Sequence, residues 1–449
     1  LPIFSIDVFP LDGVDPARMK HKENGNQADN LFYQMRQDGD NKWLFICHVD
    51  KPRNEAIAWN ERWDIKIKGE YQAVCYDTMD GKIYPVKAAI KDGNTIIHHI
   101  ASLHDSLLLK LLAIENSKKA DSVNAVDNVA KEEVFKIPQN QKNLPEPFQY
   151  RLEEHNSLLL DMAQYAFDEE EWQEREELLR IDNLFREKLH YPLRMEALAQ
   201  PWTEKDEQKS EHVLKLRFHI YSEVEMNEVE LAMEHPETAE ICWNGEALEY
   251  IDSGFYVDES IRTCKLKKLQ KGENTLFVKI PFGRKTNVEW MYLLGEFGVK
   301  TIGKYGIITN LPARLCYGDI TTQNLAFYGG SLEYKSKVST EAGIMNLEVS
   351  HYKGALLEVF LDGENKGSLF MAPYRKNLGK VEKGEHEITI KVYGNRSNTF
   401  GVVHNADRTE SWYGPNLWRT TGNKWSYEYQ LEQMGVLATP VYWIEEETD

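Results

Sequence analysis

The sequence lacks the features that mark several common classes of protein. Its 449 residues include only five cysteines, with no CxxC pair and no Cys/His cluster, which disfavours a structural zinc site and a disulfide framework. No uncharged apolar run approaches the roughly 18 residues of a membrane-spanning helix. Glycine-rich phosphate loops and the motifs Gly-x-Ser-x-Gly and His-Glu-x-x-His are also missing. Nucleotide-dependent, serine-hydrolase and zinc-hydrolase chemistry are therefore disfavoured.

Positive charge is scarce as well. The chain has 53 Lys and Arg against 72 Asp and Glu, so 53 − 72 gives a formal charge of −19. Phosphate binding needs clustered cations, so neither nucleic acid nor an anionic membrane is an expected partner. The five cysteines stand singly in apolar contexts and are predicted to be buried free thiols. That prediction favours a cytoplasmic location, or an extracellular one if a leader has been removed.

What the sequence does contain, over its first quarter, is a series of short strand-like runs. Hydrophobic segments at 43–47, 71–76 and 94–100 lie next to turns rich in Asp and Gly. A spacing of about ten residues between such turns is typical of an antiparallel sandwich and not of βαβ units. We therefore predict one β-sandwich domain over residues 1–112, with Trp43 in its core.

A polar segment and one helix follow. Residues 113–145 contain few aromatic side chains and are predicted to be a linker or an exposed insertion. Between 178 and 189, four apolar residues recur on one face at the helical period. Asp168 is the expected N-cap of this helix, so a short helical insertion is predicted near 168–190.

From residue 210 onward the strand pattern contains an internal repeat. A hairpin turn at Asn244-Gly245 precedes a Lys-Gly-Glu turn at 271–273, and Asp362-Gly363 precedes the same turn at 383–385. In both copies the second turn leads into a strand of alternating polarity. Two related sandwiches are predicted, over 146–300 and 301–449. With residues 1–112 they give an all-β chain of three β-sandwich domains, in which Trp243 and Trp290 are also expected core residues.

This order of turns resembles the galactose-binding-like jelly-roll domains of glycoside hydrolase family 2. Further segments resemble the large α-L-rhamnosidase-like proteins of glycoside hydrolase family 106. They include Asp77-x-x-Asp80-Gly81 within 36–111, 155–161, Gln200-Pro201-Trp202, 292–299, Trp412-Tyr413-Gly414-Pro415 and 427–431. The resemblance implies that the last two domains are jelly rolls and that the partner of the chain is a carbohydrate.

In that family a catalytic barrel precedes the segments that this chain resembles. A barrel needs about 250 residues of alternating strands and amphipathic helices, and no such run is present here. The resemblance therefore implies a non-catalytic region of a glycoside hydrolase that binds carbohydrate or acts as a scaffold. Its expected partner is an upstream catalytic domain.

Catalytic carboxylates cannot be assigned from the sequence. Glycoside hydrolysis normally needs two carboxylates that flank the scissile bond. Glu289 and Glu296 bracket an apolar stretch, and burial could raise their pKa values. Acids that flank a strand more often lie at its solvent-exposed ends, so we assign no catalytic residue.

A sugar site needs an aromatic platform with polar groups around it. Trp412 and Tyr413 precede a Gly-Pro pair that is typical of a loop, and Asn416 and Arg419 follow closely. These four residues are the predicted carbohydrate-binding residues. The alternative interpretation is that the aromatic residues near the end of the chain only pack between sheets.

A structural calcium ion is a second hypothesis, because sugar-binding jelly rolls often hold one. Asp252, Asp258 and Glu259 carry suitable oxygen ligands. The chain has no Asp-x-Asp-x-Asp-Gly loop, so this signal is not specific.

Two other functions stay open at this stage. The sandwiches could form an adhesin-like module that binds proteins, or the chain could be a complete glycosidase with its site on these domains. A homo-oligomer is compatible with each of these functions. Fold analogy alone does not choose among them.

Overall fold

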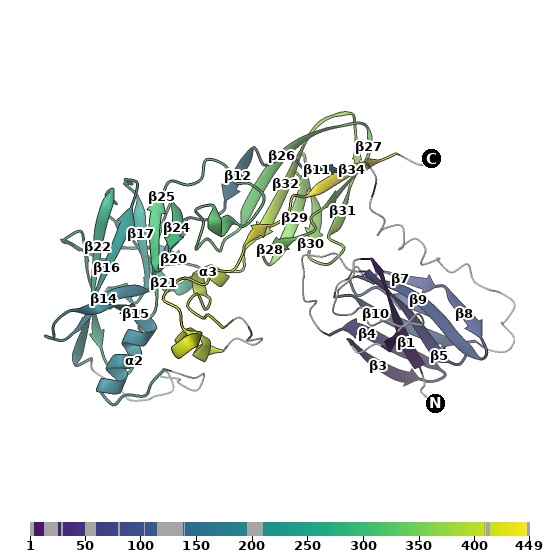
Figure 1. Cartoon of the computed structure of the whole chain (residues 1–449), viewed down its shortest axis with the longest axis horizontal. Helices are drawn as coiled ribbons and strands as arrows, with labels where there is room; N and C mark the ends of the chain where they lie inside the picture. The colour runs from purple at the N-terminus through teal and green to yellow at the C-terminus, as the bar shows by residue number, and fades with distance from the viewer. Residues whose placement is uncertain are drawn as a thin grey trace.

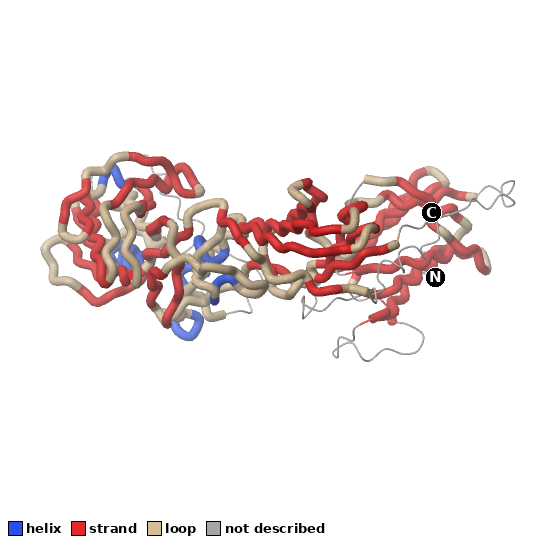
Figure 2. The backbone as a smooth tube through the Cα atoms, turned by 90° about the horizontal axis from the view of Figure 1, so that it is seen from above, coloured by secondary structure: helices blue, strands red, loops and turns tan. Residues whose placement is uncertain are grey.

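The computed structural model of the chain is built almost entirely from antiparallel sheets. It describes residues 4–12, 26–27, 30–49, 60–79, 81–102, 104–114, 138, 140–194, 210–407, 409 and 414–446. These residues form three two-sheet units, each around its own hydrophobic core. The predicted all-β sandwich class is confirmed. The three units lie in a row, the N-terminal sandwich at one end and the middle sandwich at the other (Figure 1), and the row is also seen from above (Figure 2).

The N-terminal sandwich consists of two five-stranded sheets. One has the order β2-β1-β5-β9-β8 and the other β3-β4-β10-β6-β7. The strands of the first sheet are β1 (Phe4–Asp12), β2 (Asn26–Gln27), β5 (Asn60–Lys68), β8 (Ala88–Lys91) and β9 (Asn94–Ser102). Those of the second are β3 (Leu31–Asp38), β4 (Asn41–His48), β6 (Tyr71–Tyr76), β7 (Ile83–Val86) and β10 (Ser106–Ala113). Their alternate side chains meet in a core that includes Trp63 and Leu109.

The middle sandwich contains a five-stranded and a larger sheet. The first has strands β13 (Asn156–Leu160), β17 (Val229–Glu234), β20 (Asp252–Tyr256), β21 (Asp258–Leu266) and β23 (Met291–Gly295). The second has β14 (Met162–Phe167), β15 (Gln173–Glu177), β16 (His212–Ser222), β18 (Glu240–Trp243), β19 (Glu246–Leu248), β22 (Gly272–Phe282), β24 (Gly298–Ile302) and β25 (Tyr305–Thr309). Among the strand pairs described for this unit, the pair of β25 with β16 is parallel, and an isolated parallel bridge joins Val299 of β24 to Leu325.

The C-terminal sandwich combines strands from both sides of the middle one. Its first sheet has β11 (Lys142–Asn143), β27 (Gly343–Glu348), β31 (Arg375–Val381) and β34 (Val441–Glu445). Its second has β12 (Gln149–Leu152), β26 (Leu332–Thr340), β29 (Leu356–Leu361), β30 (Glu364–Leu369) and β32 (Gly384–Tyr393), while β28 (Tyr352–Lys353) pairs with β33 (Gly435–Val436). Because β12 pairs with β26, β12 belongs to the C-terminal sandwich. The sequence prediction had placed this strand in the domain 146–300.

The predicted internal repeat has a clear structural counterpart. In the middle sandwich the β18–β19 hairpin pairs with β22, and in the C-terminal sandwich the β29–β30 hairpin pairs with β32. Asn244-Gly245 turns with φ values of 51° and 83°, and Asp362-Gly363 with 49° and 82°. Positive φ at both central positions is the type I′ geometry that matches the twist of a hairpin. Both copies therefore use the same turn at the same place in a sheet.

The predicted helix exists but begins later than expected. The helix α2 spans Leu178–Lys188, and its N-cap is Glu177, whose carboxylate accepts hydrogen bonds from the backbone of Leu179 and Arg180. Asp168 instead lies in a turn at φ 48°. Residues 173–177 form β15, which pairs with β14. Strand pairing outcompetes the helix propensity of this acidic segment, as tertiary context often does.

The remaining helical pieces are short: η4 (Pro236–Thr238), η5 (Ile320–Thr322), α3 (Ser397–Phe400), η6 (Pro415–Arg419) and η7 (Gly422–Lys424). No helix in the described part of the chain is long and apolar enough to cross a membrane. All five cysteines are free thiols, but only Cys75 and Cys264 are buried, and Cys316 is exposed. The prediction that all five are buried was wrong for Cys316, and Cys47 and Cys242 are only half-buried.

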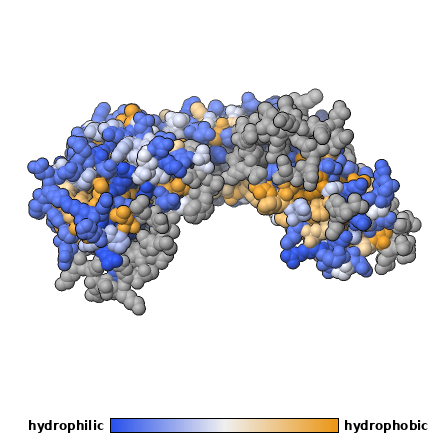
Figure 3. All heavy atoms as spheres, turned by 60° about the horizontal axis from the view of Figure 1, so that its bottom comes forward, coloured by the Kyte–Doolittle hydropathy of each residue, from blue (hydrophilic) through white to orange (hydrophobic). Residues whose placement is uncertain are grey.

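Two of the three tryptophans predicted to be core residues are buried. Trp243 and Trp290 are 2% and 8% exposed. Trp43 is only half-buried and pairs with Lys110 on the outer side of its sheet, so its core assignment was wrong. The molecular surface is largely hydrophilic, and hydrophobic side chains gather on its concave side near the N-terminal sandwich (Figure 3).

Candidate functional site

One segment of the C-terminal sandwich packs on the middle sandwich and forms a pocket there. The chain leaves β32 after Tyr393 and returns at β33. Between them, Val403 joins the core of the middle sandwich, and Phe400 and Trp418 pack against it. The Phe400 ring lies 5.2 Å from that of Tyr292. This excursion, here called the crossing segment (residues 394–434), links the two sandwiches.

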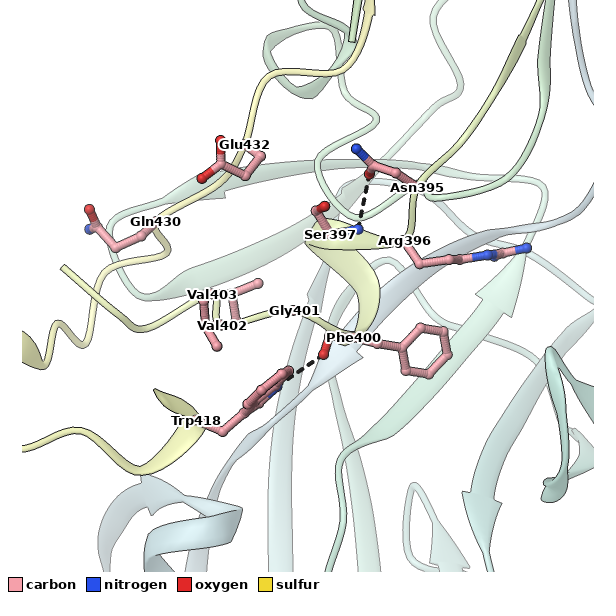
Figure 4. Close-up of a pocket in the computed structure, with 10 residues that line it drawn as sticks. All are labelled: Asn395, Arg396, Ser397, Phe400, Gly401, Val402, Val403, Trp418, Gln430 and Glu432. Carbon is pink, nitrogen blue, oxygen red and sulfur yellow. Dashed lines mark hydrogen bonds between the residues drawn. The ribbon is translucent and has the colours of Figure 1, made fainter. Parts of the chain in front are cut away.

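The pocket has a volume of about 300 Å³. Its wall combines five polar side chains with an aromatic and aliphatic surface, as Figure 4 shows. The lining residues are Asn395, Arg396, Ser397, Phe400, Gly401, Val402, Val403, Trp418, Gln430 and Glu432. All of them belong to the crossing segment, so the pocket depends on how that segment folds back on itself.

Hydrogen bonds fix the aromatic part of the wall. The indole Nε1 of Trp418 donates to the backbone oxygen of Phe400 at 3.0 Å, which Figure 4 marks with a dashed line. Trp418 is half-buried. Its ring is therefore held in one orientation while part of its surface stays accessible at the pocket, the arrangement that an aromatic platform requires.

Backbone contacts position the polar groups. The side chain of Asn398 bonds to both backbone groups of Glu432, at 2.7 and 2.8 Å. Gln430 donates from Nε2 to the backbone oxygen of Glu428 at 3.1 Å. The Asn395 side-chain oxygen accepts from the Ser397 backbone at 3.1 Å. Amide, hydroxyl and carboxylate groups are thus placed around one opening.

Arg396 has a different role, because its guanidinium is already engaged. It makes two hydrogen bonds to the carboxylate of Glu154, one of them 2.6 Å from Nη2 to Oε2. Glu154 lies in the connection between β12 and β13, where the chain passes from one sandwich to the other. Bidentate pairs of this kind fix geometry, so Arg396 holds the pocket wall against that connection.

A buried polar network underlies the crossing segment next to the pocket. His404 Nε2 lies 2.7 Å from Asp161 Oδ2, and the Tyr429 hydroxyl donates to Asp161 Oδ1 at 2.8 Å. Burial by itself would lower the pKa of His404. The hydrogen bond and the negative charge of Asp161 together raise this pKa by more than burial lowers it, so the net shift is upward. A buried charge is tolerated where its partners satisfy it.

Glu177 extends this network to the helix. Its Oε1 accepts a hydrogen bond of 2.6 Å from the indole of Trp290. Burial raises the pKa of Glu177 to about 7, against the opposing effect of the Trp290 and Leu179 hydrogen bonds. The carboxyl group therefore titrates near neutral pH although it caps a helix.

The structure brings together only part of the predicted carbohydrate site. Trp412 and Tyr413 lie outside the described residues. Asn416 and Arg419 lie on η6 together with Trp418, but neither lines the pocket. Asn416 is exposed, and Nε of the half-buried Arg419 has no hydrogen-bond partner among the described residues. Asn416 and Arg419 are therefore neighbours of the pocket-lining Trp418 on one short helix.

Sequence reasoning missed the main lining residues. The residues 395–403 and 430–432 are separated by about thirty positions and carry no motif that links them. Only the crowding of tryptophans near the end of the chain pointed toward this region. The pairing of Asn398 with the backbone of Glu432, which brings the two stretches together, is visible only in three dimensions.

Glu289 and Glu296, the two acids considered for catalysis, lie at opposite ends of β23. An extended chain rises about 3.3 Å per residue, so seven residues separate them by roughly 23 Å. Glycosidase carboxylates lie about 5 to 9.5 Å apart, so these two cannot act as such a pair. Burial and the nearby charge of Glu234 raise the pKa of Glu289 to about 7, against Arg419 and Arg194, while the Glu296 side chain is 68% exposed.

The predicted calcium ligands are not arranged as a metal site. Asp252 forms an ion pair with Arg262, and Asp258 accepts hydrogen bonds of 2.8 and 2.7 Å from the backbone and hydroxyl of Ser260. These contacts lower the pKa values of both carboxyl groups. Nowhere in the described ranges do three or more His, Cys, Asp or Glu side chains converge. Asp252, Asp258 and Glu259 do not fit a bound calcium ion.

Comparisons with known proteins give distant structural similarity only. A scan against protein-family models finds no match, and neither does a search among curated proteins. A rhamnosidase from Novosphingobium sp. PP1Y is 10% identical with a TM-score of 0.36, over 98% of this chain and 25% of that chain. An α-L-rhamnosidase from Streptomyces avermitilis, solved with L-rhamnose, is 10% identical with a TM-score of 0.21, over 98% and 35%.

A third solved structure, a β-D-mannosidase from Dictyoglomus thermophilum, is 10% identical with a TM-score of 0.21, over 53% of this chain and 31% of that one. The chain thus spans between a quarter and about a third of the length of these three proteins. At these scores the similarity carries no argument about the fold or the function of this chain. The function of the chain has to be argued from its own pocket.

Proposed function

We propose that this chain is a carbohydrate-binding and scaffolding region of a glycoside hydrolase, and that the pocket beside Trp418 holds the sugar. The observation that carries the proposal is the composition of the pocket wall. A half-buried indole lines the same volume of about 300 Å³ as amide and carboxylate groups. Ligand pockets begin at about this size, and a single sugar ring fits such a volume.

The chemistry of the wall matches that of a pyranose. One face of the ring is apolar and stacks on an aromatic surface, while the hydroxyl groups at its edge need hydrogen-bond partners. Gln430, Ser397 and Glu432 offer such partners. The turn motifs shared with sugar-binding jelly rolls support the same assignment.

Sugar titration of the purified chain tests the proposal. L-rhamnose, D-galactose and D-mannose are titrated to millimolar concentrations while tryptophan fluorescence and heat are recorded. We expect at least one of them to bind, and Gln430→Ala and Trp418→Ala to weaken that binding at least tenfold. Asn416→Ala, on the same short helix but outside the pocket, is the matched control and should bind normally. A panel without binding, or equal loss in the control, contradicts the pocket assignment.

In this proposal catalysis belongs to an upstream domain. The wide separation of Glu289 and Glu296 supports it, as does the lack of a barrel-like run in the sequence. Purified chain should therefore leave aryl-glycosides intact. Turnover that survives repeated purification would favour the complete-glycosidase alternative.

Five free thiols, one of them exposed, favour a reducing compartment such as the cytoplasm.

A further inference from the structure

Three passages of the chain between the middle and C-terminal sandwiches meet beside the pocket. They lie at 153–155, between β12 and β13, at 327–331, before β26, and at 393–397, between β32 and α3. In Figure 1, α3 lies between the two sandwiches. Phe327 belongs to the core of the middle sandwich, and the next residue, Tyr328, belongs to that of the C-terminal sandwich. The two cores are therefore in direct succession along the backbone at this place.

Glycines allow the backbones of these passages to touch. A Cβ atom at Gly394 would collide with the backbone oxygen atoms of Gly329 and Gly330. A Cβ atom at Gly329 would lie 3.0 Å from the Cα atom of Arg396, and one at Gly330 would lie 2.5 Å from the carboxyl carbon of Glu154. Packed backbone cannot move aside as the end of a side chain can, so Gly394 has no room for a larger residue. We call these five residues the glycine joint.

Hydrogen bonds between buried groups tie the three passages together. The backbone oxygen of Phe327 accepts hydrogen bonds from the hydroxyl groups of Ser157, at 3.2 Å, and of Thr399, at 2.9 Å. All three residues are buried. The hydroxyl group of the buried Tyr328 accepts a hydrogen bond of 3.1 Å from the backbone of Glu153. A hinge motion at this place would break these hydrogen bonds, so they oppose it.

Charged groups add two further links. Arg396 makes two hydrogen bonds to the carboxylate of Glu154, and a bidentate pair of this kind fixes the relative orientation of its partners. The ammonium group of Lys391 on β32 donates to the carboxylate of Glu153 at 2.7 Å. Both links join β32 and the residues after it to the passage at 153–155. Arg396 also lines the pocket, so the pocket wall is part of this junction.

Domains of one chain move relative to each other by default, unless the interface between them is large and apolar. Here Phe400 and Val403 of the crossing segment pack into the middle sandwich, and the joint adds backbone contacts and buried hydrogen bonds to this apolar anchor. We propose that the glycine joint locks the middle and C-terminal sandwiches into one rigid body, with the crossing segment as the strap that holds them. The pocket wall is then fixed in place before any ligand binds. This rigidity is a property apart from sugar binding.

The distance between two spin labels on the full chain, one on each sandwich, tests this proposal. Ile251→Cys provides the label on the middle sandwich and Ala355→Cys the label on the C-terminal one, and both positions are exposed. Cys47, Cys242 and Cys316 are replaced by serine, because these three thiols are not buried. Pulsed electron paramagnetic resonance then gives the distribution of distances between the labels in the absence of sugar.

We expect one distribution between the sandwiches, about as narrow as that of a reference pair within the middle sandwich, Ile251→Cys with Glu228→Cys. Gly394→Ala should broaden the distribution between the sandwiches at least twofold, because its Cβ atom forces the passages apart. Gly384→Ala is the matched control at the other end of β32, where a Cβ atom meets nothing within 4 Å. It should leave the distribution unchanged.

Melting temperatures establish that each variant is folded. If Gly394→Ala does not fold, Gly330→Ala takes its place, because its Cβ atom meets only the end of the Glu154 side chain and displaces it from Arg396. A broad distribution in the chain with an unaltered joint overturns the proposal. A joint variant whose distribution matches that of Gly384→Ala overturns it as well. Neither result depends on sugar binding, so the proposed function is tested separately.

Discussion

The buried carboxyl group of Glu177 makes a specific prediction about stability and pH. Its pKa is about 7 in the folded chain against an ordinary value of 4.5. The folded state therefore holds this proton at pH values where the unfolded state has lost it. The slope of the free energy of unfolding with pH follows the difference in bound protons between the unfolded and folded states. The contribution of Glu177 to this free energy therefore falls as pH rises from about 4.5 through 7 and is constant above that.

The size of this effect follows from the shift. One pKa unit corresponds to about 1.4 kcal/mol, so a shift from 4.5 to about 7 corresponds to about 3 kcal/mol between the two plateaus. Most of it arises from burial, because the side chain lies between β15, α2 and the Trp290 indole. Glu177→Gln removes the titration. It should make the pH dependence between pH 5 and 7 shallower by up to about 1.4 kcal/mol per pH unit.

The assay is urea unfolding at several pH values, read by hydrogen exchange of peptides from β16 and β22, which report on the middle sandwich alone. Glu174→Gln is the control, because Glu174 is exposed on the same strand as Glu177. It should keep the slope of the unaltered chain. His404 also has a raised pKa and contributes in the same direction above pH 6.5, but it is present in every variant. Equal slopes for Glu177→Gln and the unaltered chain would refute the reasoning.

Three further predictions concern packing and turns. In the unaltered chain the buried Arg186 guanidinium lies 2.9 Å from the Asp182 carboxylate. Asp182→Asn removes this negative charge and should destabilise the middle sandwich by about 3–5 kcal/mol in urea unfolding. Trp243→Ala should cost about 3–5 kcal/mol because it empties a core position, whereas Trp43→Ala, at a half-buried position on the outer side of its sheet, should cost far less in the same assay. Gly363→Ala meets no atom within 4 Å but forces a side chain to φ 82°, so thermal unfolding should show a loss of about 1–2 kcal/mol.

The pocket and the buried network share one structural origin. Val403 lines the pocket, and the next residue, His404, contacts Asp161 of the middle sandwich. A substitution that loosens the Asp161–His404–Tyr429 contacts therefore disturbs the pocket wall without touching a ligand. For such variants, a melting curve measured together with the binding constant distinguishes a disturbed fold from the loss of a ligand contact.

Local chemistry made part of this structure predictable from the sequence. Alternation of polar and apolar residues indicated the strands, because one face of each strand must be buried. Asn244-Gly245 and Asp362-Gly363 indicated two equivalent hairpins, because few residues accept positive φ at both central positions of a turn. These are short-range constraints, and both were found where they were expected.

The start of the helix was not predictable in this way. Residues 168–177 have a composition that favours a helical N-terminus, yet residues 173–177 form β15 because β14 offers them hydrogen-bond partners. Trp43 gave a similar error. Its strand was recognised, but which face of that strand is buried depends on the sheet that packs against it.

The sequence by itself determined the all-β class, the repeat and its turns, because each depends on neighbours a few residues apart. Only the tertiary structure decided that β12 belongs to the last sandwich, that the crossing segment packs on the middle one, and that Trp418, Gln430 and Glu432 line one pocket. Those outcomes depend on contacts between residues up to hundreds of positions apart. Such contacts are selected by the shape and burial of whole sheets, which no local pattern encodes.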